Sequence, residues 1–479
     1  MIARVLFVWI AFSVLLLLFG LYSQGEPFEL SQLALAFAMS LPVAVAVLRG
    51  GLGDSTSRQL EYPSLTLILV SAWILMVGPS LIVESQAARY LYHYSDAALT
   101  LARVFFFGWC LLFTVGAGQP RLRELSARPT ILDFIACTAF ALLIVTFLMR
   151  AGLFSNYQPS RGRLLPGAGT TESAASALGA PLFTLLPPLL FLMLTRIQNR
   201  RQPLLVFMGF LASWALLFLL GSRTGLAVAI ACCLVLCRGL GFRLRANVLL
   251  GLGAALPAVL LLILIYRNAL ATSEDSADTV SVGHLLTVAS DATSSLSEQE
   301  AQTDALDLVS GNVRVRMWYG QQFCVLIDQW LDDGAAMRGS FFSGIISSVP
   351  TLLMSNKVEL ANDLNFEVLI IQSQRFPDID LAPTPWMQWL YELGILGLVL
   401  GALFYAWLAR MIEYRISKTS SIYEILFWLG LFTSIMPPEH TTDALALNAR
   451  IMLIHVLVMG LAARGLTWLS ALGRREHAI

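Results

Sequence analysis

Long apolar runs recur along the chain from its first residues, with short polar connections between most of them. A membrane-spanning helix needs about 20 predominantly apolar residues, and twelve segments come near that length. They are residues 2–22, 29–48, 63–83, 98–116, 131–149, 173–195, 204–221, 224–237, 246–266, 386–409, 422–436 and 448–464. The first run is longer than the ~7–15 residues of a signal-peptide core and no cleavage site follows it, so it is interpreted as a span. The pattern predicts an all-α, polytopic helical membrane protein with about twelve transmembrane helices.

One connection, residues 267–385 between the ninth and tenth predicted spans, is far longer than the others. Loops beyond ~12–15 residues without structure of their own are usually functional or disordered. Within this loop, the apolar spacing over Val313–Leu331 predicts an amphipathic helix on the membrane surface. We therefore expect three parts: a membrane domain over 1–266, a large outer loop over 267–385, and a second membrane part over 386–479.

Composition agrees with a membrane protein and excludes several other classes. The chain is 57% hydrophobic and 13% charged, whereas soluble domains are ~25% charged. Intrinsic disorder and a nucleic-acid partner bound through a basic surface are therefore excluded. Five of the six cysteines fall within predicted spans and no CxxC pair is present, so neither a zinc site nor a disulfide framework is expected.

The basic residues indicate how the chain is oriented, because short cytoplasmic loops collect Lys and Arg. With the N-terminus inside, alternate connections contain 18 of the 31 basic residues, and the opposite connections 23–28, 84–97 and 437–447 contain only Arg89. Both termini are then predicted to be cytoplasmic. The long loop falls on the outer side with 16 acidic and 6 basic residues, so the zero net charge of the chain is a balance between two sides of a membrane.

Arginine is the main candidate for chemistry. No Walker loop, GxSxG elbow, HExxH motif or dinucleotide fingerprint is present, so ATPase, soluble hydrolase and dehydrogenase functions have no support. An arginine at the membrane edge is costly and usually faces a polar cavity or an anion, and its planar fork matches phosphate. The outer-side candidates are Arg223 in a Gly-Ser-Arg-Thr-Gly turn, Arg314 and Arg316 at the head of the loop helix, and Arg161 and Arg163 in the loop 151–172. The alternatives are a snorkelling arginine at a tight turn and a solvated helix start.

Three carboxylates lie where the long loop enters the tenth predicted span: Asp378, Asp380 and Glu392. Any of them could serve as the general base that takes a proton from a substrate hydroxyl. Glu392 sits at a depth where an unpaired carboxylate is expensive, so it could instead pair structurally with an arginine.

Four stretches, mostly within residues 205–405, give the chain a resemblance to the bacterial O-antigen polymerase and ligase superfamily. Ser222-Arg223-Thr224-Gly225 is similar to the family's Ser-Arg-x-Gly at the outer end of a span, and Arg314-Val315-Arg316-Met317-Trp318 is similar to its R-x-x-x-W. Ser348-Val349-Pro350 followed by Asn356-Lys357 resembles the polymerases' VPR-x-LWP-x-K stretch. Thr384-Pro385 and then Tyr391-Glu392-Leu393-Gly394 resemble the exit from the loop into a glycine-containing span.

The resemblance implies an integral glycosyltransferase of the bacterial inner membrane that uses undecaprenyl-diphosphate-linked oligosaccharides as donor and acceptor. No metal, nucleotide or other cofactor is then expected. Arg223, Arg314 and Arg316, with Arg161, Arg163 and Lys357, would bind substrate and diphosphate. Whether a chain-length regulator also binds is left open.

Departures from the family pattern favour a repeat-unit polymerase over an O-antigen ligase. The ligases carry a His-Asn pair shortly before the Glu-Leu-Gly element, and Pro383-Thr384 stands in that place here. The polymerase pattern also differs, because Thr351 replaces its arginine and Met354-Ser355 replaces its Trp-Pro. A polysaccharide or lipid transporter is the alternative from another class, but the duplicated halves with broken spans typical of transporters are not found.

Overall fold

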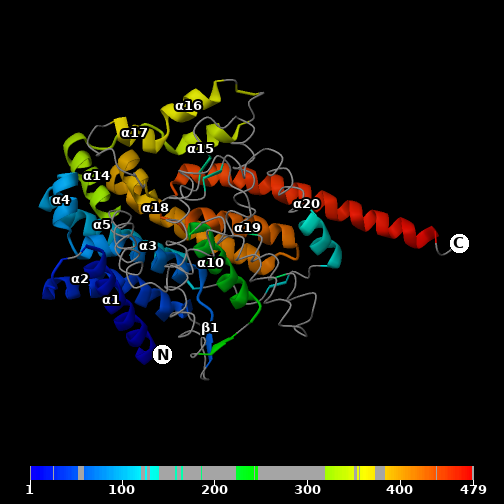
Figure 1. Cartoon of the computed structure of the whole chain (residues 1–479), viewed down its shortest axis with the longest axis horizontal. Coiled ribbons are helices and arrows are strands. Elements are labelled where there is room, and N and C mark those ends of the chain that lie inside the picture. Colours follow the sequence, from blue (N-terminus) through cyan, green and yellow to red (C-terminus); the bar gives the residue numbers. More distant parts are fainter. Residues whose placement is uncertain are drawn as a thin grey trace, which may run out of the picture. The chain divides into compact units, whose positions relative to one another are not determined.

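The structure is a computed structural model (Figure 1). It describes residues 2–24, 26–51, 59–119, 125–126, 130–139, 157–158, 163–164, 185, 192, 223–241, 243–245, 319–349, 353–354, 356–372, 383–438 and 440–476. The chain divides into two compact units. The first contains Met1–Arg123, Ser310–Tyr414 and Leu431–Arg450, and the second contains Glu124–Val309, Arg415–Gly430 and Ile451–Ile479.

Six helices of the described residues are long and apolar enough to cross a membrane. They are α1 (Ile2–Gln24), α2 (Leu30–Ala46, continued by the π-helical turn η1, Val47–Gly51), α3 (Leu65–Ile82), α5 (Asp96–Ala117), α18 (Pro385–Lys418) and α20 (Thr442–Glu476). Two shorter apolar helices are α10 (Arg223–Gly239) and α19 (Ile422–Ile435). Among the described residues, the prediction of a predominantly helical chain with several apolar helices of membrane-spanning length is confirmed, which fits a polytopic membrane protein.

These eight helices coincide with eight of the twelve predicted spans, although α10 and α19 are shorter than a full crossing. The other four predicted spans, 131–149, 173–195, 204–221 and 246–266, lie wholly or mostly outside the described residues, and the total of about twelve stays a prediction. Strands in the described parts are short: β1 (Gln59–Glu61), β2 (Tyr157–Gln158), β3 (Arg163–Leu164) and β4 (Arg243–Arg245).

Serine and threonine caps define where the main helices of the first unit begin. Ser64 accepts a hydrogen bond from the N–H of Leu67 at the start of α3, and Ser95 accepts one from Ala98 at the start of α5. Thr384 precedes α18 in the same way: its hydroxyl accepts from the N–H of Met387 at 3.4 Å, and Pro385 is the first helical residue. Such residues satisfy backbone donors that a helix start leaves unpaired.

An aromatic cluster packs α3, α5 and α18 together in the first unit. Trp73 lies 4.7 Å from Phe113 and 6.1 Å from Trp386, centroid to centroid, and Trp109 lies 6.1 Å from Trp386. All four side chains are almost fully buried. Because each ring buries about 150–250 Å², this cluster is a major part of what holds the three helices in register.

Four helices come from the long loop: α14 (Tyr319–Asp333), α15 (Phe341–Ser348), α16 (Lys357–Asp363) and α17 (Phe366–Gln372). α14 packs on α3, on α5 and on α4 (Gln86–Tyr92), and these elements lie side by side in Figure 1. The contact with α3 is close, because the N–H of Gly320 donates to Ser80 Oγ at 3.1 Å and a Cβ at Gly320 would clash with that oxygen.

The predicted amphipathic helix over Val313–Leu331 is confirmed from Tyr319 onward, and it continues to Asp333. Its first part does not have the expected solvated face, since every residue from Tyr319 to Ile327 is buried. Gln321 and Gln322 are buried too, and they donate to the Ser80 carbonyl and to the Tyr92 hydroxyl. The expectation of a one-sided surface helix is therefore wrong for these residues, because both side-chain NH₂ groups donate to neighbouring helices, although Gln321 Oε1 is buried without a hydrogen-bond partner.

In the second unit, α10 ends against the segment before residue 130. The N–H of Leu125 donates to the carbonyl of Gly239 at 2.8 Å. The Tyr423 hydroxyl donates to Asp133 at 2.7 Å. β2 and β3 pair antiparallel, with Gln158 opposite Arg163.

Candidate functional site

The segment Gly334–Ser340, which joins α14 to α15, is docked on a kink in α18. Gly394 interrupts that helix with φ 62° and ψ −146°, a conformation that favours glycine. The interruption leaves the Tyr391 carbonyl free to accept the N–H of Ala336 at 2.7 Å. One turn of α18 thus exchanges an internal hydrogen bond for one that holds the loop segment.

Glu392 completes this attachment. Its Oε2 accepts the N–H of Gly339 at 2.8 Å and its Oε1 accepts the N–H of Ser340 at 2.7 Å. The side chain is only 2% exposed. A carboxylate that accepts two backbone amides forms strong, charge-assisted hydrogen bonds, so Glu392 fastens the start of α15 to α18.

This geometry changes the interpretation of Glu392. No arginine among the described residues forms an ion pair with it, so the structural partner expected from the sequence was the wrong one. Both oxygens also accept backbone donors, and the side chain is only 2% exposed, so the geometry limits the access of a substrate hydroxyl to it. The geometry therefore gives Glu392 a positioning role, in which it holds the segment before α15.

A cavity of about 360 Å³ lies next to this attachment, between α14 and the kink of α18. Its lining combines aromatic, charged and amide side chains: Leu326, Gln329, Trp330, Asp333, Gly334, Ala335, Ala336, Arg338 and Tyr391. The volume is at the lower end of the range of about 300–1,000 Å³ for small-molecule sites. This cavity, called here the α14–α18 cavity, can hold a small polar ligand.

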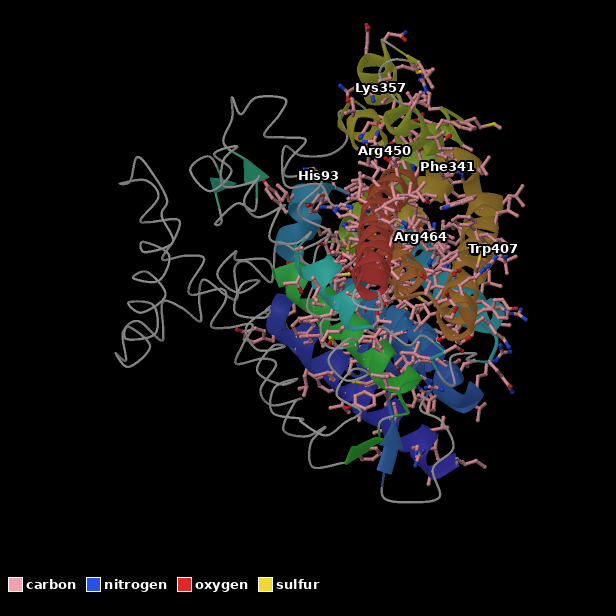
Figure 2. All side chains as sticks on the ribbon, turned by 90° about the vertical axis from the view of Figure 1, so that its right-hand side faces the viewer. His93, Phe341, Lys357, Trp407, Arg450 and Arg464 are labelled. Atoms are coloured by element: carbon pink, nitrogen blue, oxygen red, sulfur yellow. The ribbon has the colours of Figure 1, made fainter. Side chains whose placement is uncertain are left out.

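Two cations meet at the C-terminal end of α15. Nη1 of Arg450 donates to the carbonyls of Ser347 at 3.1 Å and Ser348 at 3.3 Å, and Nζ of Lys357 donates to the next carbonyl, that of Val349, at 2.7 Å. Figure 2 labels both cations together with Phe341, where α15 begins. Cations are favoured at a helix C-terminus by the peptide dipoles. No carboxylate of the described residues pairs with either cation.

Gln388 connects the helices around these groups. Its Oε1 accepts the N–H of Thr442 at 2.8 Å, and its Nε2 donates to Ser340 Oγ at 3.1 Å and to Asp443 at 3.4 Å. Gly344 of α15 lies so close to α20 that a Cβ there would overlap the Asp443 carbonyl. The start of α20 is therefore fixed against α15 and α18.

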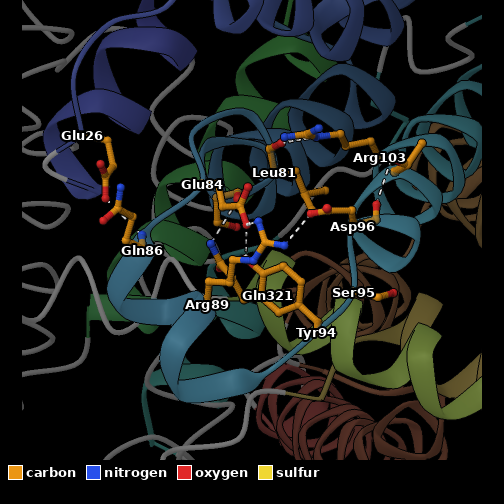
Figure 3. Close-up of polar contacts among 12 residues, drawn as sticks. Glu26, Leu81, Glu84, Gln86, Arg89, Tyr94, Ser95, Asp96, Arg103 and Gln321 are labelled. Carbon is orange, nitrogen blue, oxygen red and sulfur yellow. Dashed lines mark hydrogen bonds and ion pairs between the residues drawn. The ribbon is translucent and has the colours of Figure 1, made fainter.

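A further polar cluster joins α4 to the start of α5 (Figure 3). Arg89 forms ion pairs with Glu84 at 3.1 Å and with Asp96, and these contacts, first the hydrogen bond to Asp96, raise the pKa of its guanidinium. Asp328 of α14 accepts the N–H of Ser95 at 2.6 Å. Arg89, which stood out in the sequence as a lone outer-side base, is thus paired locally.

The other predicted site residues are distributed over both units. Lys357 is the first residue of α16 in the first unit. Arg223 is the first residue of α10, and Arg163 lies in β3, both in the second unit. Asp378, Asp380, Arg161, Arg314 and Arg316 lie outside the described residues. Within the described ranges, no three His, Cys, Asp or Glu residues are grouped as a metal site would require.

Sequence reasoning missed Arg450, Gln388 and the charged lining of the cavity, Asp333 and Arg338. Arg450 carried a usable signal, because it interrupts an apolar run at a depth where a cation needs a partner. The other three carried none, since isolated polar residues beside a loop are ordinary.

Comparisons of the chain with protein-family models, with curated proteins and with solved structures found no match.

Proposed function

We propose that the protein is a glycosyltransferase that polymerises undecaprenyl-diphosphate-linked oligosaccharide repeat units on the periplasmic side of the bacterial inner membrane, with both termini in the cytoplasm. The observation that carries this proposal is the pair of cations, Arg450 and Lys357, at the end of α15. They bind consecutive carbonyls beside the stretch that resembles the polymerases' VPR-x-LWP-x-K motif.

An anion is the ligand that this pair suits. Two positive charges without a described carboxylate partner attract a group with at least one negative charge. Arg450 also has a buried Nε with no hydrogen-bond acceptor in the structure. A diphosphate next to the membrane supplies both charge and acceptor oxygens, and arginine and lysine are the usual residues that bind it.

The reaction needs few groups from the protein. An acceptor hydroxyl oxygen attacks the anomeric carbon of the donor, the bond from that carbon to the diphosphate oxygen breaks, and the lipid diphosphate leaves. Cations placed where its charge develops lower the barrier. The hydroxyl proton passes to a carboxylate, for which Asp378 and Asp380 are the candidates now that Glu392 is engaged with backbone amides.

Thr384 supports a polymerase over a ligase. It occupies the place of the ligases' His-Asn pair, and its side chain is fully buried with the hydroxyl capping α18. A buried cap cannot do the work of a histidine that reaches substrate. Arg223, Arg314, Arg316, Arg161 and Arg163 remain candidates for the donor from the sequence resemblance.

The test is the polymer ladder formed in cells that lack the natural gene and carry a variant. Arg450→Ala and Lys357→Ala should shorten or abolish the ladder, since loss of one such charge-stabilising donor typically lowers a rate about 10²–10³-fold. Arg464→Ala is the matched control, because Arg464 is an exposed arginine of the same helix α20 (Figure 2).

Ladders of wild-type length from both variants, at normal protein levels, would refute the proposed site. Chains of normal length that are no longer attached to lipid A core would instead indicate the ligase. Purified protein that lengthens no lipid-linked repeat unit would refute polymerisation itself.

A further inference from the structure

We propose that the α14–α18 cavity binds a neutral saccharide, one or two sugar rings of the lipid-linked substrate. This inference rests on the proposed function for the identity of the larger molecule, but its chemistry comes from the cavity. The volume of about 360 Å³ suits a ligand of that size, and the lining offers both flat apolar surfaces and hydrogen-bonding groups.

The aromatic lining is held in place before any ligand arrives. Trp330 packs against Phe105 of α5, with ring centroids 6.0 Å apart. It also lies close to the kink of α18, since a Cβ added at Gly394 would be 3.0 Å from Trp330 Nε1. Tyr391 packs against Phe366 of α17 at 5.4 Å. Fixed aromatic rings lose little entropy on binding. Trp330 is partly exposed and is the ring that the C–H face of a pyranose would contact, whereas Tyr391 is 8% exposed and forms the back of the cavity.

The polar lining matches hydroxyl groups, which both donate and accept. Arg338 supplies only donors, Asp333 only acceptors, and Gln329 supplies both. Gln329 Oε1 is buried and has no hydrogen-bond partner in the structure. A ligand hydroxyl that donates to this oxygen would satisfy it.

Charge separates this cavity from the cation pair at the other end of α15. The cavity lining contains one cationic residue, Arg338, and one anionic residue, Asp333, so its formal net charge is zero, whereas Arg450 and Lys357 carry two positive charges. The cavity lies beside the start of α15 and the cations lie at its end, so a helix of eight residues separates them. At 1.5 Å per residue that is roughly 12 Å. A substrate with its diphosphate at the cations could place a neutral sugar one or two units away in the cavity.

The attachment at Glu392 forms one wall of the site. The segment Gly334–Ala336 lines the cavity, and the bonds from Ala336 to Tyr391 and from Gly339 to Glu392 hold the segment in place. Gly334 and Gly339 adopt φ 76° and 78°, conformations that allow this short connection to turn twice.

The experiment measures saccharide binding directly, without any reaction. The whole protein in detergent is mixed with methyl glycosides of di- and trisaccharides built from glucose, galactose, mannose, rhamnose and N-acetylglucosamine, and binding is followed by saturation-transfer NMR. At least one sugar should bind the wild type. Arg338→Ala and Asp333→Asn should weaken that binding about tenfold, the loss expected for one charged hydrogen-bonding group.

Glu359→Gln, an exposed residue of α16, is the control and should bind as the wild type does. Thermal unfolding checks that each variant is folded. If Arg338→Ala does not fold, Arg338→Lys replaces it, because lysine keeps the positive charge but lacks the planar, bidentate guanidinium. A wild type that binds none of these sugars, or folded cavity variants that bind as well as the wild type, would overturn the proposal. If sugars bind in the cavity but lipid-linked repeats are not polymerised, the proposed function fails while this site stands.

Discussion

Substitution of Glu392 separates a positioning role from a catalytic one. Its two oxygens accept the amides of Gly339 and Ser340 at 2.8 and 2.7 Å in a site where the side chain is 2% exposed. A hydrogen bond to a charged group contributes about 1.5–3 kcal/mol. Glu392→Ala loses both bonds and leaves the two amides without acceptors, so we expect a loss of roughly 3–6 kcal/mol. Glu392→Gln keeps one acceptor and turns an NH₂ group toward the other amide, so roughly 2–3 kcal/mol should be lost.

Trypsin cleavage after Arg338 reports this loss where it occurs, because Arg338 lies in the segment that Glu392 holds. When opening is fast relative to cleavage, the cleavage rate follows the population of the open form. A weakening of 2–3 kcal/mol therefore predicts cleavage roughly 30- to 150-fold faster in Glu392→Gln. Glu359→Gln on α16 is exposed and should change stability by less than about 0.5 kcal/mol.

The opposite pattern would refute this reasoning. If Glu392→Gln is cleaved at Arg338 as slowly as the wild type but no longer polymerises lipid-linked repeats, then Glu392 acts in the chemistry. If both variants polymerise normally and resist trypsin, the carboxylate neither reacts nor holds the loop.

Three further outcomes follow from the packing. Gly344→Ala should destabilise the protein by about 1–3 kcal/mol in thermal unfolding, because its Cβ would overlap a backbone carbonyl of α20. Gly108→Ala is the control and should be neutral or stabilising, because no atom lies within 4 Å of a Cβ there. Gly394→Ala should cost about 1–2 kcal/mol for its φ of 62° and should also displace the Trp330 indole, which acrylamide quenching would detect. Burial raises the pKa of the Cys324 thiol, so at pH 8 iodoacetamide should label it only after unfolding in SDS; labelling of the folded protein would show that α14 is not packed as described.

The helices were the most predictable part of this protein. Each predicted span that falls in the described residues coincides with an apolar helix, because hydropathy over about 20 residues measures the one property a bilayer requires. The prediction was weaker for α14, which was expected to be an amphipathic surface helix, because Gln321 and Gln322 are buried. Their partners, Ser80 and Tyr92, are more than 200 residues away in the chain, and no local pattern reports them.

The candidate site was likewise predicted only in part. The sequence singled out Tyr391-Glu392-Leu393-Gly394 as a unit, and the structure makes that unit the attachment for the segment before α15. The sequence did not predict what the carboxylate binds. Every residue except proline has a backbone N–H, so residue types do not show which N–H will be the donor. Arg450 was passed over as part of an apolar run, and its contact with Ser347 spans 103 residues.

The sequence alone predicted a chain of long apolar helices with one long polar connection, since both properties are sums over neighbouring residues. Tertiary structure decided which charges are engaged. Arg89 is paired with Glu84 and Asp96, and Glu392 is held by two amides, whereas Arg450 and Lys357 meet at one helix end without a described carboxylate. The physical reason is that electrostatic and hydrogen-bond energies depend on distances of a few ångströms between side chains. Only the folded chain sets those distances.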